Sequence, residues 1–101
     1  MNLSPFYLQT IEYSCRNFAF IKPLELAPSF DETQQLYYLE YADLGIDVFA
    51  YTRDQLDQEL REQIVFLWDS YALADDAELT ETATQLKINL LNRLKEIIDA
   101  A

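Results

Sequence analysis

The residues that could carry out chemistry in this chain are almost all carboxylates, because the sequence contains no histidine. Without histidine there is no Ser-His-Asp or Cys-His catalytic group and no imidazole metal ligand. The single glycine, Gly45, excludes the glycine-rich loops that bind nucleotide phosphates. The single cysteine, Cys15, lies in a predicted strand, where a buried structural thiol is expected. We therefore expect a protein that is not an enzyme and has no cofactor.

Two groups of carboxylates lie close enough in the sequence to be weighed as sites. Asp75, Asp76 and Glu78 lack the alternating ligands, central glycine and closing glutamate of a calcium-binding loop. Asp43 and Asp47 flank a predicted turn, and turn chemistry accounts for the first of them. The sequence therefore predicts no catalytic residues and no metal site.

Acidic residues are concentrated in the middle of the chain. The 101 residues include eighteen acidic and seven basic side chains, which give a net charge of −11. Residues 31–81 hold fourteen of the acids against only Arg53 and Arg61, a net charge of −12. Such a field repels nucleic acid and anionic lipid and attracts basic molecules. We expect a basic protein partner, no direct nucleic-acid binding and no membrane binding, with solubility alone as the competing explanation.

The first half of the chain has the periodicity of strands. Alternation of apolar and polar residues predicts strands over residues 7–21, 34–41 and 46–51. Residues 42–45 form a short turn, with Gly45 where a positive φ is useful. The last two strands should pair as an antiparallel hairpin. In the third strand, one face is predicted to hold Ile46, Val48 and Ala50, and the other Asp47, Phe49 and Tyr51.

Two amphipathic helices follow the strands. Thr52 and Gln55 match a capping box that opens the first helix, which should end near residues 71–74. Thr80 is predicted to cap a second helix whose apolar stripe continues through Ile97. The expected fold is a single α+β domain over residues 1–101, with a three-stranded antiparallel sheet in β-β-β-α-α order and both helices packed on one face. Its predicted core is Ile11, Phe18, Val48, Leu56, Leu60, Ile64, Trp68, Leu86, Leu90 and Leu94.

The sheet face opposite the helices is predicted to be an interface. Base-stacking aromatic residues normally come with Lys or Arg, whereas the aromatic residues of this hairpin come with acids, which suits a protein partner better. A homodimer is the simplest such interface, and a solvated face with scattered tyrosines is the alternative. The predicted partner-binding residues are Tyr37, Glu40, Tyr41, Asp43, Asp47 and Phe49.

The turn Asp43-Leu44-Gly45, followed by a strand and by Thr52 at the start of an acidic helix, resembles the N-terminal domain of HicB-type antitoxins. The resemblance covers residues 13–72 and implies a partly degraded double-stranded-RNA-binding-like β-β-β-α fold. The family's proline before the turn glycine is absent, and Ala50-Tyr51 replaces its Gly-Asp before the capping threonine. Its C-terminal DNA-binding module is not recognisable after Thr80.

This resemblance implies a protein that binds and covers a small basic toxin, which is an RNA-cleaving enzyme in that family. Three other functions stay open: an acidic inhibitor that mimics nucleic acid, a secretion-type chaperone, and a small domain with no antitoxin role. The first five residues contain no basic segment, and no apolar run approaches the ~20 residues of a membrane-spanning helix. A cytoplasmic location is therefore expected.

Overall fold

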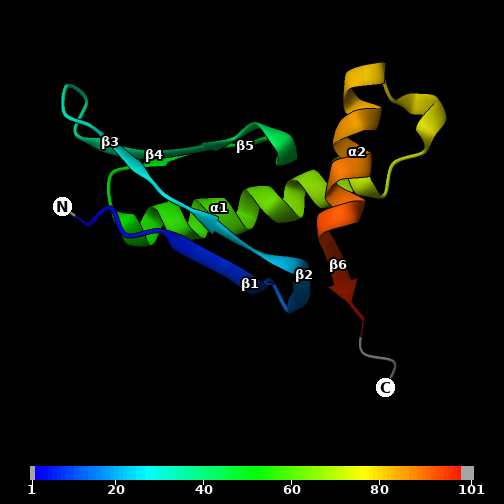
Figure 1. Ribbon diagram of the computed structural model, residues 1–101, viewed down its shortest axis with the longest axis horizontal. Coiled ribbons are helices and arrows are strands. Elements are labelled where there is room, and N and C mark those ends of the chain that lie inside the picture. The colour runs from blue at the N-terminus through cyan, green and yellow to red at the C-terminus, as the bar shows by residue number, and fades with distance from the viewer. Residues whose placement is uncertain (1, 99–101) are drawn as a thin grey trace.

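Two antiparallel sheets, instead of the single sheet predicted, enclose the first helix in the computed structural model, which describes residues 2–98. One three-stranded sheet has the order β1-β2-β6 and the other the order β3-β4-β5. Figure 1 shows α1 between them, with β3, β4 and β5 on one side and the β1–β2 hairpin on the other. The α+β class is confirmed, but the two helices do not cover one face of one sheet.

The predicted first strand is two strands, β1 (Phe6–Tyr13) and β2 (Arg16–Leu26), which pair antiparallel. The turn between them consists of Ser14 and Cys15, with φ values of 53° and 64°. Two consecutive positive φ values are typical of the tightest hairpin turns, which usually carry Asn or Gly. The expectation of a buried Cys15 in a strand is therefore wrong, because the residue lies exposed at a hairpin tip.

The predicted hairpin is confirmed as β4 (Leu36–Tyr41) and β5 (Ile46–Ala50), with the short strand β3 (Ser29–Asp31) on the outer side of β4. A 3-10 turn, η1 (Ala42–Leu44), connects β4 to β5. Gly45 ends this turn with φ at 73°, as predicted. Ile46, Val48 and Ala50 are buried and Asp47 and Phe49 are exposed, so the two predicted faces of β5 are also confirmed.

Both helix caps lie where the sequence predicts them. The side chain of Thr52 accepts a hydrogen bond of 3.1 Å from the backbone N–H of Gln55 at the start of α1 (Arg53–Leu67). The helix continues as a π-helical turn, η2 (Trp68–Ala72). After a 3-10 turn, η3 (Asp76–Glu78), Thr80 accepts from the N–H of Ala83 at 3.2 Å and caps α2 (Glu81–Arg93).

The second helix is shorter than predicted. It ends at Arg93, and the chain continues as β6 (Leu94–Ile97), which pairs antiparallel with β2 and places Leu94 opposite Phe20. Apolar residues such as Leu94 and Ile97 fit a helical stripe and a short strand alike. The chain forms a strand here instead of continuing the helix because pairing satisfies backbone groups of β2 that would otherwise form an open edge.

A single hydrophobic core joins the two sheets and both helices. Phe18 and Trp68 meet edge to face at its centre, with ring centroids 5.8 Å apart. Every predicted core residue is buried except Leu86, which is partly buried against the cluster. Over residues 2–98, no helix is long and apolar enough to cross a membrane.

Candidate partner-binding surface

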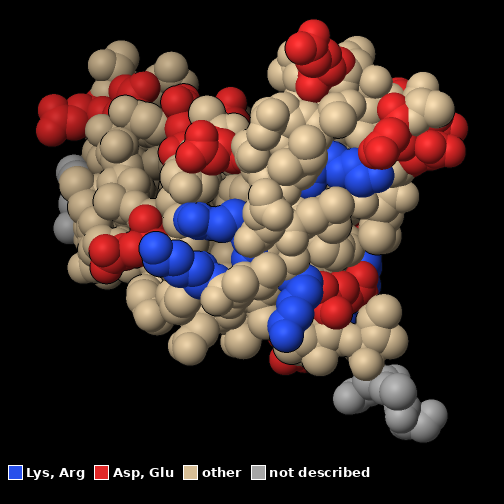
Figure 2. All heavy atoms as spheres, turned by 45° about the vertical axis from the view of Figure 1, so that its right-hand side comes forward, with Lys and Arg blue, Asp and Glu red and all other residues tan. Residues whose placement is uncertain are grey.

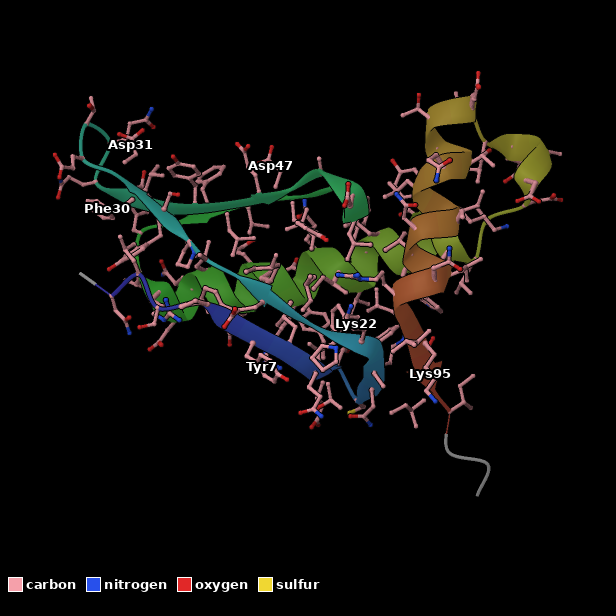
Figure 3. The ribbon with its side chains drawn as sticks, viewed as in Figure 1. Tyr7, Lys22, Phe30, Asp31, Asp47 and Lys95 are labelled. Carbon is pink, nitrogen blue, oxygen red and sulfur yellow. The ribbon has the colours of Figure 1, made fainter. Side chains whose placement is uncertain are left out.

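The face of β4 and β5 that points away from α1 carries both aromatic and acidic side chains. Strand register places Tyr38 opposite Phe49 and Glu40 opposite Asp47. Figure 3 shows the side chain of Asp47 pointing away from α1. Phe49 is 65% exposed and Tyr38 is 38% exposed. These four side chains form the sheet half of a candidate surface.

Two of the predicted partner-binding residues lie on the other side of the sheet. Tyr37 and Tyr41 are partly buried and pack against the core. The ring of Tyr37 meets that of Phe30 edge to face with centroids 5.0 Å apart. The hydroxyl of Tyr41 accepts a hydrogen bond of 3.4 Å from Arg93. Register explains this split, because Tyr37 and Tyr41 stand opposite the buried Ala50 and Ile46.

Asp43 lies apart from the other predicted residues. It is exposed in η1, where its carbonyl oxygen accepts a hydrogen bond of 2.8 Å from the side chain of Asn89 on α2. The predicted set therefore divides among three places, and only Glu40, Asp47 and Phe49 share the outer face. Tyr38, which is not among the predicted residues, also belongs to this face.

Helix α1 contributes exposed side chains beside β5. Glu59, Glu62 and Phe66 recur at helical spacing on its exposed side, and Phe66 is 62% exposed. These residues are not among those predicted, because helical periodicity cannot show that a helix face borders a sheet edge. We call the following residues together the acidic–aromatic surface: Tyr38, Glu40, Asp47, Phe49, Glu59, Glu62 and Phe66.

A groove runs between β5 and α1 within this surface. It consists of two hollows of about 410 and 400 Å³ that share Phe49, Glu59 and Glu62 as lining residues. Neither hollow is lined by a lysine or an arginine. We call it the β5 groove, and its lining residues are Asp47, Val48, Phe49, Ala50, Tyr51, Gln55, Gln58, Glu59, Glu62, Gln63 and Phe66.

One side chain covers part of the open edge of β5. The Nε2 of Gln63 donates to the carbonyl oxygen of Asp47 at 3.2 Å, and its Oε1 accepts from the N–H of Asp47 at 2.8 Å. In an antiparallel strand, residues two apart direct their backbone groups to the same edge. The N–H and C=O of Phe49 therefore also point away from β4 at the edge of the sheet, toward the β5 groove.

Basic side chains gather on a different part of the molecule. Figure 2 shows several lysines and arginines on one face of the molecule, with acidic side chains beside them. Figure 3 places Lys22 and Lys95 on strands of the other sheet. The β5 groove, in contrast, is lined by Asp47, Glu59 and Glu62 without a basic residue, so it presents negative charge to an approaching molecule.

The strongest ionic cluster links three separate elements. Arg16 at the start of β2 makes paired hydrogen bonds to Asp69 on η2 (2.8 and 2.9 Å) and to Glu96 on β6 (2.9 and 2.9 Å). Its guanidinium also lies 5.2 Å from the ring centroid of Phe18. Each of the four carboxylate oxygens accepts a hydrogen bond from Arg16, so this cluster holds β6 and η2 to the hairpin.

The same contacts shift the pKa values of the cluster. Hydrogen bonds from Arg16 hold the pKa of Asp69 and that of Glu96 below their ordinary values, against an opposing effect of burial. The pKa of Arg16 is raised by those two carboxylates. The indole N–H of Trp68 is buried and makes no hydrogen bond.

The other carboxylates weighed in the sequence take part in local structure. Asp75 accepts a hydrogen bond of 3.2 Å from the N–H of Ala77, and Asp76 pairs with Lys87 at 2.8 Å. In the described part of the chain, no three Cys, Asp or Glu side chains are grouped so that they could hold a metal ion.

Comparison of the chain with protein-family models, with curated proteins and with solved structures gives no match. The resemblance to HicB-type antitoxins, which rests on Asp43-Leu44-Gly45 and Thr52, therefore stays a prediction.

Proposed function

We propose that this protein is a non-catalytic binding domain that binds a basic protein through its acidic–aromatic surface. The observation that carries the proposal is the exposure of Phe49 and Phe66 in a groove whose charged lining is entirely acidic. Aromatic anchors surrounded by polar groups are characteristic of protein interfaces. The aromatic rings of the surface would therefore supply affinity, and its carboxylates would select a positively charged partner.

The two kinds of side chain would contribute differently to binding. Burying an exposed phenylalanine contributes about 1.5–3 kcal/mol. The carboxylates of Asp47, Glu59 and Glu62 would mainly speed the encounter and orient a positively charged partner. Binding should therefore weaken with added salt without being abolished as readily as a purely ionic contact.

The partner class favoured by the resemblance is a small basic toxin that acts on RNA. An acidic surface complements the basic surface with which such an enzyme binds its substrate. A protein that mimics nucleic acid needs only acidic side chains, which imitate the charges of the phosphate backbone. The exposed rings of Phe49 and Phe66 therefore favour a protein contact in which they are buried over simple mimicry.

Affinity capture from the host cell tests this proposal. Tagged wild-type protein, a Phe49→Ala/Phe66→Ala variant and a Tyr7→Ala variant are compared at low and high salt, and retained proteins are identified by mass spectrometry. Tyr7 is a matched control, since it is 64% exposed on the other sheet.

The expected result is a basic protein that the wild type and the Tyr7 variant retain at low salt and that the double variant loses. Purified partner and purified protein should then reproduce the difference. Equal retention by all three proteins, or failure to capture any basic protein, would contradict the proposal.

A further inference from the structure

We propose that the β5 edge accepts an extended basic segment of the partner as an added strand, paired first with Phe49. Gln63 holds the adjoining position at Asp47 until that segment displaces it. The inference rests on the proposed function and specifies the conformation and charge pattern of what is bound.

The edge has the backbone groups that strand addition needs. β5 is the last strand of its sheet, and its edge faces the β5 groove. The N–H and C=O of Phe49 point outward, as argued from the hydrogen bonds at Asp47. In strand addition, such main-chain groups supply affinity, and pockets for alternate side chains supply specificity.

Gln63 marks where the added strand would continue. Its side-chain amide offers one donor and one acceptor to Asp47, which is the pair of bonds that a neighbouring strand would make. A side chain that occupies an edge in this way also protects it from indiscriminate pairing. A segment paired at Phe49 can extend to Asp47 only by replacing the two bonds of Gln63.

Charge determines the composition of the added segment. Alternate side chains of a strand point to opposite faces, so one set would face α1 and meet Glu59 and Glu62. Lysine or arginine fits this set. The other set would lie on the outer face beside Phe49, where apolar or aromatic residues fit. The recognised segment therefore alternates basic with apolar residues.

The same charges argue against a second copy of this chain at this edge. Pairing of β5 with β5 would bring Asp47, Glu59 and Glu62 of two copies together, and like charges in close contact are unfavourable. The predicted homodimer is therefore not favoured at β5. Self-association through this edge becomes one of the outcomes of the test.

The probe is a short peptide that alternates lysine with valine. It is compared with the same peptide N-methylated at its central residues, which keeps the charges but removes backbone donors. Binding to the full-length protein is measured by titration, and protection of the Phe49 amide from hydrogen exchange is measured by NMR. The expected result is binding of the plain peptide with protection at Phe49, and a loss of at least about tenfold in affinity on N-methylation.

Two matched variants test the part assigned to Gln63. Gln63→Ala frees the backbone of Asp47, whereas Gln85→Ala makes the same change at an exposed position on α2, outside the groove. We expect Gln63→Ala to bind the plain peptide about tenfold more tightly, because two backbone bonds no longer have to be broken, and Gln85→Ala to bind as the wild type does.

Other results overturn the inference in distinguishable ways. Equal binding of both peptides, weakened by Glu59→Lys/Glu62→Lys, would contradict strand addition and leave the proposed function standing. No binding of either peptide, or dimerisation of Gln63→Ala through β5 without peptide binding, would also overturn strand addition. In those two cases the proposed function is decided separately by the capture experiment.

Discussion

The side chain of Gln63 on α1 pairs with both backbone groups of Asp47 on β5, at 2.8 and 3.2 Å. The contact lies at the edge of β5, and α1 is packed into the core beside this strand through the buried Leu56, Leu60 and Ile64. Glu59, Glu62 and Phe66 lie within one helical turn of Gln63 and are therefore presented beside β5. Packing of α1 beside β5 thus brings the carboxylates of a helix and the exposed ring of Phe49 to the same groove.

Replacing Trp68 by alanine should reduce the free energy of unfolding by about 3–5 kcal/mol, because truncating a buried aromatic ring leaves a cavity. Trp68 is buried against Phe18. Urea unfolding measures the loss. Phe66→Ala on the same helix is the control and should change stability by less than about 0.5 kcal/mol, since its side chain is exposed. An unchanged midpoint for the Trp68 variant would refute the packing described above.

Replacing Arg16 by methionine should destabilise the protein by about 1–2 kcal/mol at neutral pH, because partly exposed bidentate ion pairs to Asp69 and Glu96 are lost. The folded-state pKa values of both carboxyls lie below their ordinary values of 3.8 and 4.5. Their contribution is therefore complete above these ordinary values and is lost as the pH falls through the lower folded-state values.

The free energy of unfolding of the wild type and of Arg16→Met, measured from neutral to acid pH, checks the prediction. The difference in stability between them should shrink as the solution is acidified. Arg61→Met is the control, since its pair with Asp57 at 3.2 Å lies one turn apart on the surface of α1. A difference that stays constant with pH for Arg16→Met would show that its ion pairs do not stabilise the fold.

Replacing Gly45 by alanine should cost about 1–2 kcal/mol, because an L-residue is strained at a left-handed backbone conformation. The φ of Gly45 is +73°, and an added Cβ would lie 3.2 Å from a methyl carbon of Leu86. Thermal unfolding should show a lower Tm, and Gly45→Asn should lose less because asparagine tolerates this conformation better. An unaltered Tm for the alanine variant would contradict the turn geometry.

The sequence predicts best those parts of the fold that depend on local chemistry. The caps at Thr52 and Thr80, the positive φ of Gly45 and the alternation in β5 all follow from the residues themselves and are confirmed. The turn at Ser14 and Cys15 was missed because neither residue type signals a positive φ.

Features that depend on distant pairing could not be predicted in the same way. β6 forms because β2 offers an edge more than seventy residues earlier in the chain, as the pairing of Phe20 with Leu94 shows. Of the candidate surface, the sequence predicted only Glu40, Asp47 and Phe49. Glu59, Glu62 and Phe66 join it because α1 lies along β5, and helical periodicity alone cannot specify which strand edge a helix borders.

Titration of the captured basic partner against charge-reversed variants tests the central claim most directly. Glu59→Lys/Glu62→Lys changes the β5 groove, whereas Glu12→Lys/Glu25→Lys makes the same change in net charge on the other sheet. The proposed function predicts that the groove variant loses at least about tenfold in affinity and that the other variant binds as the wild type does. Equal weakening of both variants would show that only net charge attracts the partner, and no weakening of either would place the binding site elsewhere.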